Sequence, residues 1–254
     1  MQVVILAGGL GTRLSEETSK LPKPMVTIGE LPILVHIMKW YAKFGHKHFV
    51  VALGYKGEVI KEYFKNYRAQ SQDIRVQTKE DGYVELSAKE IDDWTIDLID
   101  TGTDAQTARR LLNLRNYLDN RFMLTYGDGL SNVNLDALLR LHTSSKKIAT
   151  VTAVRPPARF GSLQLEGSRV ISFSEKNSLD VGWINGGFFV FEKEFLDFIP
   201  QGNISLESEP MNKLVECNQL AAFKHEGFWL GMDTVREREI LQQIWKNGDA
   251  PWLT

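Results

Sequence analysis

"MQVVILAGGLGTRL", residues 1–14, joins a short apolar run to a loop that holds three glycines. Residues 3–6 have the length and the branched side chains of a buried strand. Further along, residues 33–44 carry apolar side chains at helical spacing, and the pattern stops before Gly45. A strand, a glycine loop and a helix in this order predict an open α/β sheet, in which ligands lie beyond the carboxyl ends of the strands.

The same alternation of strand and helix patterns continues through roughly the first 150 residues. It predicts a mostly parallel, Rossmann-like sheet flanked by helices. The segments are a strand, a helix and a strand at 48–53, 59–67 and 73–77, followed by 95–100, 108–118, 122–128 and 135–142. The polar stretch 79–94 predicts an excursion from this sheet without a defined conformation.

Beyond residue 150 the strand-like stretches follow one another closely, with turn signals between them. They predict a mixed or antiparallel extension of the sheet. Because the chain shows no internal repeat and no linker rich in proline or glycine, we expect a single domain over residues 1–254. Residues 1–150 and 151–254 would form its two parts.

The composition narrows the function class. Hydrophobic residues make up 43%, charged residues 24%, and the net charge is -2. There is no basic excess to bind nucleic acid and no run of 18 apolar residues to span a membrane. Cys217 is the only cysteine, which excludes an intrachain disulfide and suits the reducing cytoplasm. The first residues lack the basic leader of a signal peptide.

The glycines of the loop, Gly8, Gly9 and Gly11, would let backbone N–H groups approach phosphate oxygens. A tight turn that requires positive φ is the alternative. Two specific phosphate motifs fail here. The G-x-G-x-x-G pattern of dinucleotide-binding proteins needs glycine where Leu14 stands, and no G-x-x-x-x-G-K-[ST] occurs in the chain.

Two cations follow this loop. Arg13 can bind phosphate oxygens with two parallel N–H groups, and Lys23 offers a compact positive charge. Pro22 and Pro24 restrict the backbone on either side of Lys23. The alternative is an ordinary surface loop, but the glycine loop just before favours a lysine directed at the same ligand.

Two aspartates far apart in the sequence complete the pattern. Asp128, in "FMLTYGDG" (122–129), comes directly after an apolar strand, and Asp233 lies in "GFWLGMDT" (227–234) among apolar residues. Asp128 could be a turn or cap residue, and Asp233 a helix N-cap. With a phosphate loop present, a shared Mg²⁺ is favoured, because this ion prefers one or two carboxylates plus phosphate oxygens and water.

A third group of polar residues lies in the second half of the chain. Glu175 could accept hydrogen bonds from vicinal hydroxyls, Lys176 could bind a sugar phosphate, and Asn185 offers both a donor and an acceptor. A surface ion pair and a β-bulge are the alternatives for these residues.

Together, "LAGGLGTRL", "PKP", "YGD", "EK", "NGG" and "MDT" resemble the sugar-1-phosphate nucleotidylyltransferases. The segments "GYKGEVIKEYF", "LIDTG", "RFGSL", "INGGFFVF" and "APW" are similar to the glucose-1-phosphate cytidylyltransferases of that family, and they span nearly the whole chain. This resemblance implies a Rossmann-like fold and the reaction of CTP with glucose 1-phosphate to CDP-glucose and pyrophosphate. It also implies a pathway to bacterial surface polysaccharide and a homo-oligomer such as a hexamer.

The resemblance also assigns roles to individual residues. It places Arg13, Lys23 and Asp128 at the reacting phosphates, and Mg²⁺ on Asp128 and Asp233. Arg109 is the alternative to Arg110 in the alignment with the family's nucleotide-binding segment. The nucleotide would be held by Leu6, Ala7, Gly8, Gly9, Gly11, Thr12, Arg13, Lys23, Thr101, Gly102, Thr107, Arg110 and Gly127, and the sugar by Tyr126, Glu175, Lys176, Asn185 and Gly186.

Three rival functions stay open from the sequence. The same scaffold could use UTP or dTTP, because base choice depends on a few hydrogen bonds that spacing does not assign. A regulatory sugar-nucleotide-binding protein without catalysis is the second, and the four charged residues Arg13, Lys23, Asp128 and Asp233 count against it. An NAD-dependent oxidoreductase is the third, and Leu14 counts against it.

Overall fold

The computed structural model describes residues 1–9, 11, 21–79, 82–87, 90–156, 162–174 and 182–253. Its centre is a seven-stranded sheet in the order β14-β10-β13-β8-β1-β4-β7. Every strand runs parallel to its neighbours except β13, which is antiparallel to both β8 and β10. These strands are β1 (Gln2–Leu6), β4 (His48–Leu53), β7 (Thr95–Asp100), β8 (Arg121–Tyr126), β10 (Ala149–Val154), β13 (Ile184–Glu192) and β14 (Leu220–His225). The prediction of a mostly parallel α/β sheet with a mixed extension is confirmed.

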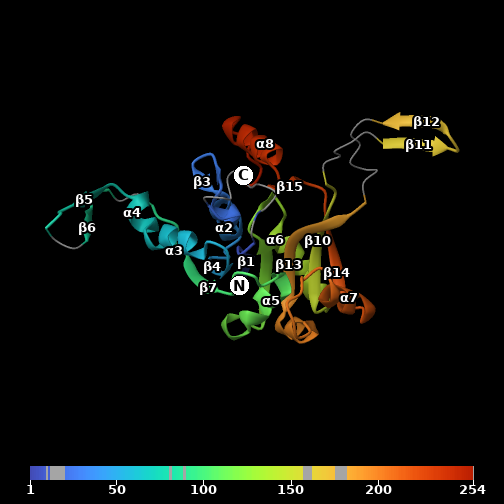
Figure 1. The fold of residues 1–254 in the computed structure, drawn as a ribbon, viewed down its shortest axis with the longest axis horizontal. Helices are drawn as coiled ribbons and strands as arrows, with labels where there is room; N and C mark the ends of the chain where they lie inside the picture. Colours follow the sequence, from blue (N-terminus) through green and yellow to red (C-terminus); the bar gives the residue numbers. More distant parts are fainter. Residues whose placement is uncertain are drawn as a thin grey trace.

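Helices cover this sheet, and short strand pairs lie around it (Figure 1). The helices are η2 (Lys23–Met25), α2 (Ile33–Lys43), α3 (Gly57–Lys65), α4 (Tyr67–Ser71), α5 (Thr107–Asn113), η3 (Arg115–Tyr117), α6 (Leu135–Ser145), η5 (Lys193–Phe198), α7 (Glu209–Glu216) and α8 (Val235–Lys246). The short pairs are β2 (Thr27–Ile28) with β3 (Leu31–Pro32), β5 (Ile74–Val76) with β6 (Tyr83–Glu85), β9 (Gly129–Ser131) with β15 (Trp229–Gly231), and β11 (Ser162–Glu166) with β12 (Arg169–Ser174).

Strand β1 shows why the sheet is covered on both faces. Its side chains alternate, so that Val3 and Ile5 join the core under α2 while Val4 and Leu6 join the core under α5. All of β1 is buried, and each fully buried aliphatic side chain contributes about 1.5–3 kcal/mol. The fully apolar run at the start of the sequence is therefore a central strand.

Helix α2 ends where the sequence predicts. Gly45 follows it with φ at +80°, a conformation that favours glycine, and the Gly45 N–H donates to the Ala42 carbonyl. The predicted helices at 59–67 and 135–142 correspond to α3 and α6. The predicted helix at 108–118 is shorter, because α5 ends at Asn113 and a single 3-10 turn, η3, follows.

Three strands that the sequence assigns to the central sheet, β5, β11 and β12, pair elsewhere. Residues 73–77 form β5, which pairs with β6 and not with the central sheet, so the parallel neighbour of β4 is β7. Likewise β11 and β12 pair with each other and not with the extension of the sheet. Figure 1 shows these two ribbons at opposite ends of the molecule. A strand pattern does not tell which partner a strand pairs with, and this explains the error.

The single-domain interpretation stays a prediction, although both parts of the chain contribute strands to one sheet. None of the helices in the described part of the chain has the length and the apolar composition needed to cross a bilayer.

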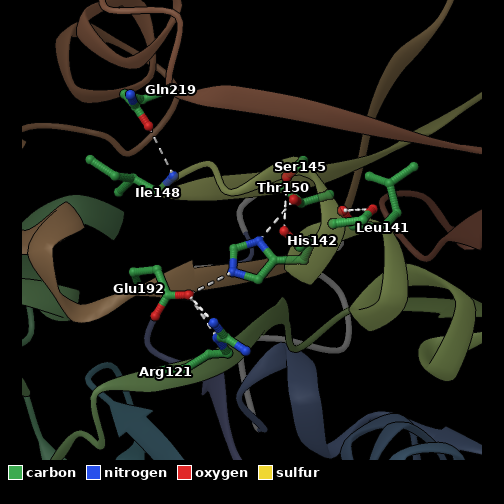
Figure 2. A network of polar contacts seen from close by, with 9 residues as sticks. Arg121, Leu141, His142, Ser145, Ile148, Thr150, Glu192 and Gln219 are labelled. Carbon is green, nitrogen blue, oxygen red and sulfur yellow. Dashed lines mark hydrogen bonds and ion pairs between the residues drawn. The ribbon is translucent and has the colours of Figure 1, made fainter.

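The amino end of β8 carries a buried polar network (Figure 2). Arg121 and Glu192 are register partners on β8 and β13, and the Arg121 Nε donates to Glu192 Oε1 at 2.7 Å. His142 of α6, fully buried, places Nε2 3.2 Å from the same oxygen and Nδ1 2.9 Å from Thr150 Oγ1. Since a carboxylate only accepts, Nε2 carries the proton, and the Thr150 hydroxyl donates to Nδ1 of the neutral ring.

Candidate active site

A cleft of about 410 Å³ opens beyond the carboxyl ends of β1 and β8, the edge of the sheet that the sequence predicts for the ligand. Many residues proposed from the sequence meet there. These are Leu6, Ala7, Gly8, Gly9, Gly11, Lys23, Thr107, Arg110, Tyr126, Gly127, Asp128 and Asp233. Thr12, Arg13, Glu175 and Lys176 lie outside the described residues.

Lys23 joins the two aspartates in this cleft. Its Nζ donates to Asp128 Oδ2 at 2.6 Å and to Asp233 Oδ1 at 2.8 Å. Pro22 precedes it with φ −66° and ψ 146°, and Pro24 follows inside η2. The two prolines therefore hold Lys23 in a short rigid turn, as the sequence predicts.

The pairing of β9 with β15 explains how the two acids meet across more than 100 residues of sequence. Asp128 comes directly before β9, Asp233 follows β15, and these strands pair antiparallel. The Met232 N–H also donates to the Asp128 carbonyl at 2.8 Å. An antiparallel pair places the start of one strand beside the end of the other, so the two carboxylates emerge together.

The alternative for Asp233, a helix N-cap, is wrong. The N-cap of α8 is Thr234, whose Oγ1 accepts from the Glu237 N–H at 3.3 Å. Glu237 in turn accepts from the N–H groups of Thr234 and Asp233 at 2.9 and 2.8 Å. This capping box fixes the backbone of Asp233 and leaves its carboxylate directed at Lys23.

In this cluster one ammonium faces two carboxylates. Burial acts to lower the pKa of Lys23, but the charges and hydrogen bonds of Asp128 and Asp233 outweigh it, so the pKa is raised above its ordinary value. Lys23 is 12% exposed, whereas Asp128 and Asp233 are 35% and 41% exposed. Lys23 is therefore protonated at neutral pH, and the two acids keep surface on the cleft for another cation.

The glycines of the loop differ in what they require. Gly11 has φ at +63°, which agrees with the tight-turn alternative. A Cβ at Gly9 would meet no atom within 4 Å in the described part of the chain. A Cβ at Gly8 would lie 2.3 Å from the guanidinium of Arg110, so space for that side chain is what Gly8 provides. The approach of phosphate to bare backbone stays a prediction for all three glycines.

Arg110 lies under the loop with 3% of its surface exposed. Its terminal nitrogens donate to backbone carbonyls, among them Gly8 O at 2.8 Å and Leu53 O at 2.9 Å. Burial lowers its pKa, and Asp100 and Asp104 oppose that shift. Between the two alignments left open, Arg110 lines the cleft.

Thr101 and Gly102 lie beside Arg110 and outside the cleft lining. Thr101 is buried and its hydroxyl donates to Leu53 O at 2.7 Å, while Gly102 turns the chain with φ at +95°. Thr107 begins α5 on the cleft, where its Oγ1 accepts from the Leu206 N–H at 2.7 Å. Thr107 therefore lines the cleft, whereas Thr101 and Gly102 lie behind it and contact Arg110.

Of the sugar-binding residues predicted from the second half, Asn185 contacts Tyr126, which lines the cleft. The Tyr126 hydroxyl donates to Glu207 Oε1, and Asn185 Nδ2 donates to the Tyr126 oxygen at 3.3 Å. Asn185 Oδ1 accepts from the Gly187 N–H at 2.8 Å, and the Gly186 carbonyl accepts from Trp229 Nε1 at 2.7 Å. Burial, followed by the charge of Glu207, raises the pKa of Tyr126.

Several cleft residues were missed from the sequence. They are Pro24, Ala105, Gln106, Ser205 and Glu207. Glu207 is the one with a chemical role in the cleft, because it accepts from Tyr126 and lies 3.2 Å from the Thr107 hydroxyl. Its sequence context, "SLESEP" (205–210), carries no motif, so the fold alone brings it to the site.

Comparisons with known proteins agree with this geometry. A family model described as nucleotidyl transferase matches residues 2–234. A protein of Salmonella typhi named glucose-1-phosphate cytidylyltransferase is 45% identical over 100% of this chain and 99% of its own length. A protein of Bacillus subtilis named as a probable glucose-1-phosphate cytidylyltransferase is 42% identical over 99% of each chain. The crystal structure of HddC from Yersinia pseudotuberculosis, 23% identical, superposes with a TM-score of 0.69 over 96% of this chain and 99% of its own, which shows the shared fold.

Proposed function

This chain belongs to the nucleotidyl transferase family, and we propose that it forms CDP-glucose and pyrophosphate from CTP and glucose 1-phosphate. Its named relatives at 42% and 45% identity cover the full length and support this substrate pair. The rival oxidoreductase function has no support in these comparisons.

One observation carries the proposal: Lys23 lies between Asp128 and Asp233 in a cleft lined by the glycine loop. The reaction brings two polyanions together, because an oxygen of the sugar phosphate attacks the α-phosphorus of CTP. Catalysis of such a transfer depends on positioning and on cancelling negative charge. A lysine held at the carboxyl edge of the sheet is placed for that task, and no protein nucleophile is needed.

The two acids fit a magnesium ion. Both already direct an oxygen at one cation, the Lys23 ammonium, and both keep part of their surface exposed on the cleft. The described residues contain no group of three or more His, Cys, Asp or Glu side chains able to enclose a metal, which suits an ion that keeps phosphate and water ligands. The chemistry that bound Mg²⁺ supplies is polarisation of the phosphate under attack.

The chain's own residues take the remaining roles. With a metal on the two acids, Lys23 would bind the phosphates and steady the charge at phosphorus. Arg13 would stabilise the departing pyrophosphate. Tyr126 and Asn185, held by Glu207 and by the Gly187 N–H, would orient the sugar hydroxyls together with Glu175 and Lys176.

We further propose that the protein works in the cytoplasm as a homo-oligomer such as a hexamer, without nucleic acid or membrane partners. The support is the resemblance, together with apolar side chains that stand exposed on both ribbons. Val76 and Val84 are 59% and 58% exposed on β5 and β6, and Val170 is 51% exposed on β12. The mass in solution, measured by light scattering, tests this state, and a monomer at micromolar concentration would contradict it.

The nucleotide preference tests the proposed function. Pyrophosphate release is measured with glucose 1-phosphate and CTP, UTP, dTTP, ATP or GTP at equal Mg²⁺. We expect CTP to give a kcat/KM at least about tenfold above every other nucleotide, a difference of about 1.4 kcal/mol. Faster release with UTP or dTTP would assign the rival pyrophosphorylase function, and no release with any nucleotide would leave a binding protein. The variant Lys23→Ala, purified in parallel, controls for contaminating activity.

A further inference from the structure

The side chain of Arg110 contacts the carboxyl ends of three neighbouring parallel strands. The order β1-β4-β7 brings their carboxyl ends together, and Arg110 of α5 lies across them. Its Nη2 donates to Gly8 O after β1 at 2.8 Å, and its Nη1 donates to Leu53 O at the end of β4 at 2.9 Å. Beyond β7 it reaches Gly102 O at 2.7 Å and Thr103 O at 3.0 Å.

Two glycines leave the space that this guanidinium occupies. A Cβ on Gly8 or on Gly54 would lie 2.3 Å from Arg110 Nη1, far inside van der Waals contact. Neither glycine has positive φ, so backbone conformation does not demand glycine at these positions. Their common requirement is room for Arg110.

The geometry of the peptide bond links Arg110 to the cleft. A trans peptide is planar, so its C=O and N–H point in opposite directions. Arg110 and the Tyr55 N–H, at 2.8 and 3.3 Å, both donate to the Gly8 carbonyl and hold it below the loop. The N–H of the next residue, Gly9, is thereby directed the other way, and Gly9 lines the cleft.

We propose that Arg110 is a positioning residue, which fixes the Gly8–Gly9 peptide so that its N–H group is presented to a phosphate of the nucleotide. This inference rests on the proposed function for the identity of the nucleotide. Arginine suits the task because its planar fork donates several hydrogen bonds in fixed directions, whereas lysine offers one compact charge. Within the described residues, the hydrogen-bond partners recorded for Arg110 are all neutral oxygens, so its charge lies beneath the loop without a contacting carboxylate.

The first experiment distinguishes an effect on the nucleotide from an effect on the sugar phosphate. In Arg110→Lys we expect kcat/KM for the nucleotide to fall by about 10- to 100-fold, because small displacements of binding groups cost that much, while KM for glucose 1-phosphate changes less than about twofold. Arg115→Lys is the matched control and should keep full activity, because Arg115 lies in η3, the turn that follows the same helix, and pairs with Asp197 on the surface. Added guanidinium ion should restore part of the activity of Arg110→Ala.

Equal losses of kcat/KM toward both substrates would overturn the proposal. A changed ratio of CTP to UTP turnover would also overturn it, because that change indicates direct contact between Arg110 and the base.

The second experiment uses Gly54, which lies outside the cleft lining. Gly54→Ala should displace the guanidinium and lower kcat/KM for the nucleotide by about tenfold or more, as a lost positioning group does. Adding Gly54→Ala to Arg110→Ala should cost little further, because the clashing group is already gone. Gly182→Ala, where a Cβ meets nothing within 4 Å in the described part of the chain, is the control.

Full activity in Gly54→Ala, or losses that add in full in the double variant, would contradict the role of Arg110. Both experiments use the nucleotide that the wild-type protein prefers in the panel above. A different base preference would therefore refute the proposed function and still leave the role of Arg110 measurable. Thermal unfolding of each variant identifies any that fail to fold, and Arg110→Lys, the mildest change, then decides.

Discussion

The two ends of strand β8 carry ion-pair clusters that differ in their charge balance. At the carboxyl end one ammonium, Lys23, faces the carboxylates of Asp128 and Asp233. At the amino end the guanidinium of Arg121 faces Glu192, and the ring of His142 is neutral. Among the contacts recorded for the described residues, the first cluster joins one cation to two carboxylates, and the second joins one cation to one carboxylate.

The two clusters also differ in which of their groups are exposed to solvent. The His142 side chain is 0% exposed and both of its nitrogens have partners, while Arg121 at the rim of this network is 38% exposed. Asp128 and Asp233, by contrast, keep more than a third of their side-chain surface exposed. A network centred on a buried ring whose two nitrogens are both hydrogen-bonded stabilises a fold, whereas two partly exposed carboxylates on one cleft are placed to bind an ion. The comparison therefore assigns stability to one end of β8 and chemistry to the other.

The largest expected effect is on turnover. Asp128→Asn or Asp233→Asn should lower kcat by at least about 100-fold, because one charge-stabilising contact in the transition state is worth about 3 kcal/mol or more. The free energy of unfolding should change little, since either change leaves Lys23 with one carboxylate. Steady-state pyrophosphate release and urea unfolding measure the two quantities.

The matched control is Asp93→Asn. Asp93 lies 3.5 Å from Lys47 on the surface, with its side chain 92% exposed, and we expect no measurable loss of activity. Near wild-type turnover in both cleft variants would remove the distinction between the two clusters.

The next effect is on stability. His142→Leu should lower the free energy of unfolding by about 1–3 kcal/mol, because it leaves the fully buried Thr150 hydroxyl without its partner. We expect kcat to stay within about twofold of wild type, since the network lies at the far end of β8. A large loss of turnover in a folded His142→Leu protein would show that the amino end also serves the reaction.

The smallest effect is on the pH dependence of stability. Burial lowers the pKa of His142, Arg121 lowers it further, and Glu192 opposes the shift. A group whose pKa is depressed in the folded state binds its proton more readily when unfolded. The free energy of unfolding should therefore fall as the pH drops below the ordinary histidine pKa of about 6.5 toward the folded value.

Other buried histidines act in the same direction, since burial also lowers the pKa of His36, His46 and His225. His142→Leu should therefore flatten the pH profile between about pH 7 and 5 without abolishing its slope. Urea unfolding at half-unit pH steps gives the profile. A slope identical to wild type would mean that the ring is already protonated in the native network.

The strand–loop–helix unit at the start of the chain is predicted well from the sequence. Glycines, prolines and the spacing of apolar residues determine the conformation of the residues next to them, so their effect can be read without the fold. Asp128 and Asp233 could also be singled out, since each follows an apolar strand. The pairing of β9 with β15, which brings them together, could not be predicted from strands of three residues. Short strands take their partners from the tertiary fold.

Other features lie beyond sequence patterns for similar reasons. Glu207 and His142 act through contacts made by the fold, and no spacing marks them. The carbonyls that Arg110 holds come from segments after three strands, so its place beneath the loop follows from sheet order. Gly8 could be selected as part of the loop, but its close approach to Arg110 could not be foreseen.

The most direct test of the account is the position of a metal ion with the nucleotide bound. We propose anomalous diffraction from crystals grown with Mn²⁺ and CTP, which locates the ion independently of the refined structure. The account predicts a single peak at ligand distance, about 2.1 Å, from carboxylate oxygens of both Asp128 and Asp233, with Lys23 Nζ moved onto a phosphate. A peak elsewhere, or Lys23 still bound to both acids beside an ordered CTP, would contradict it.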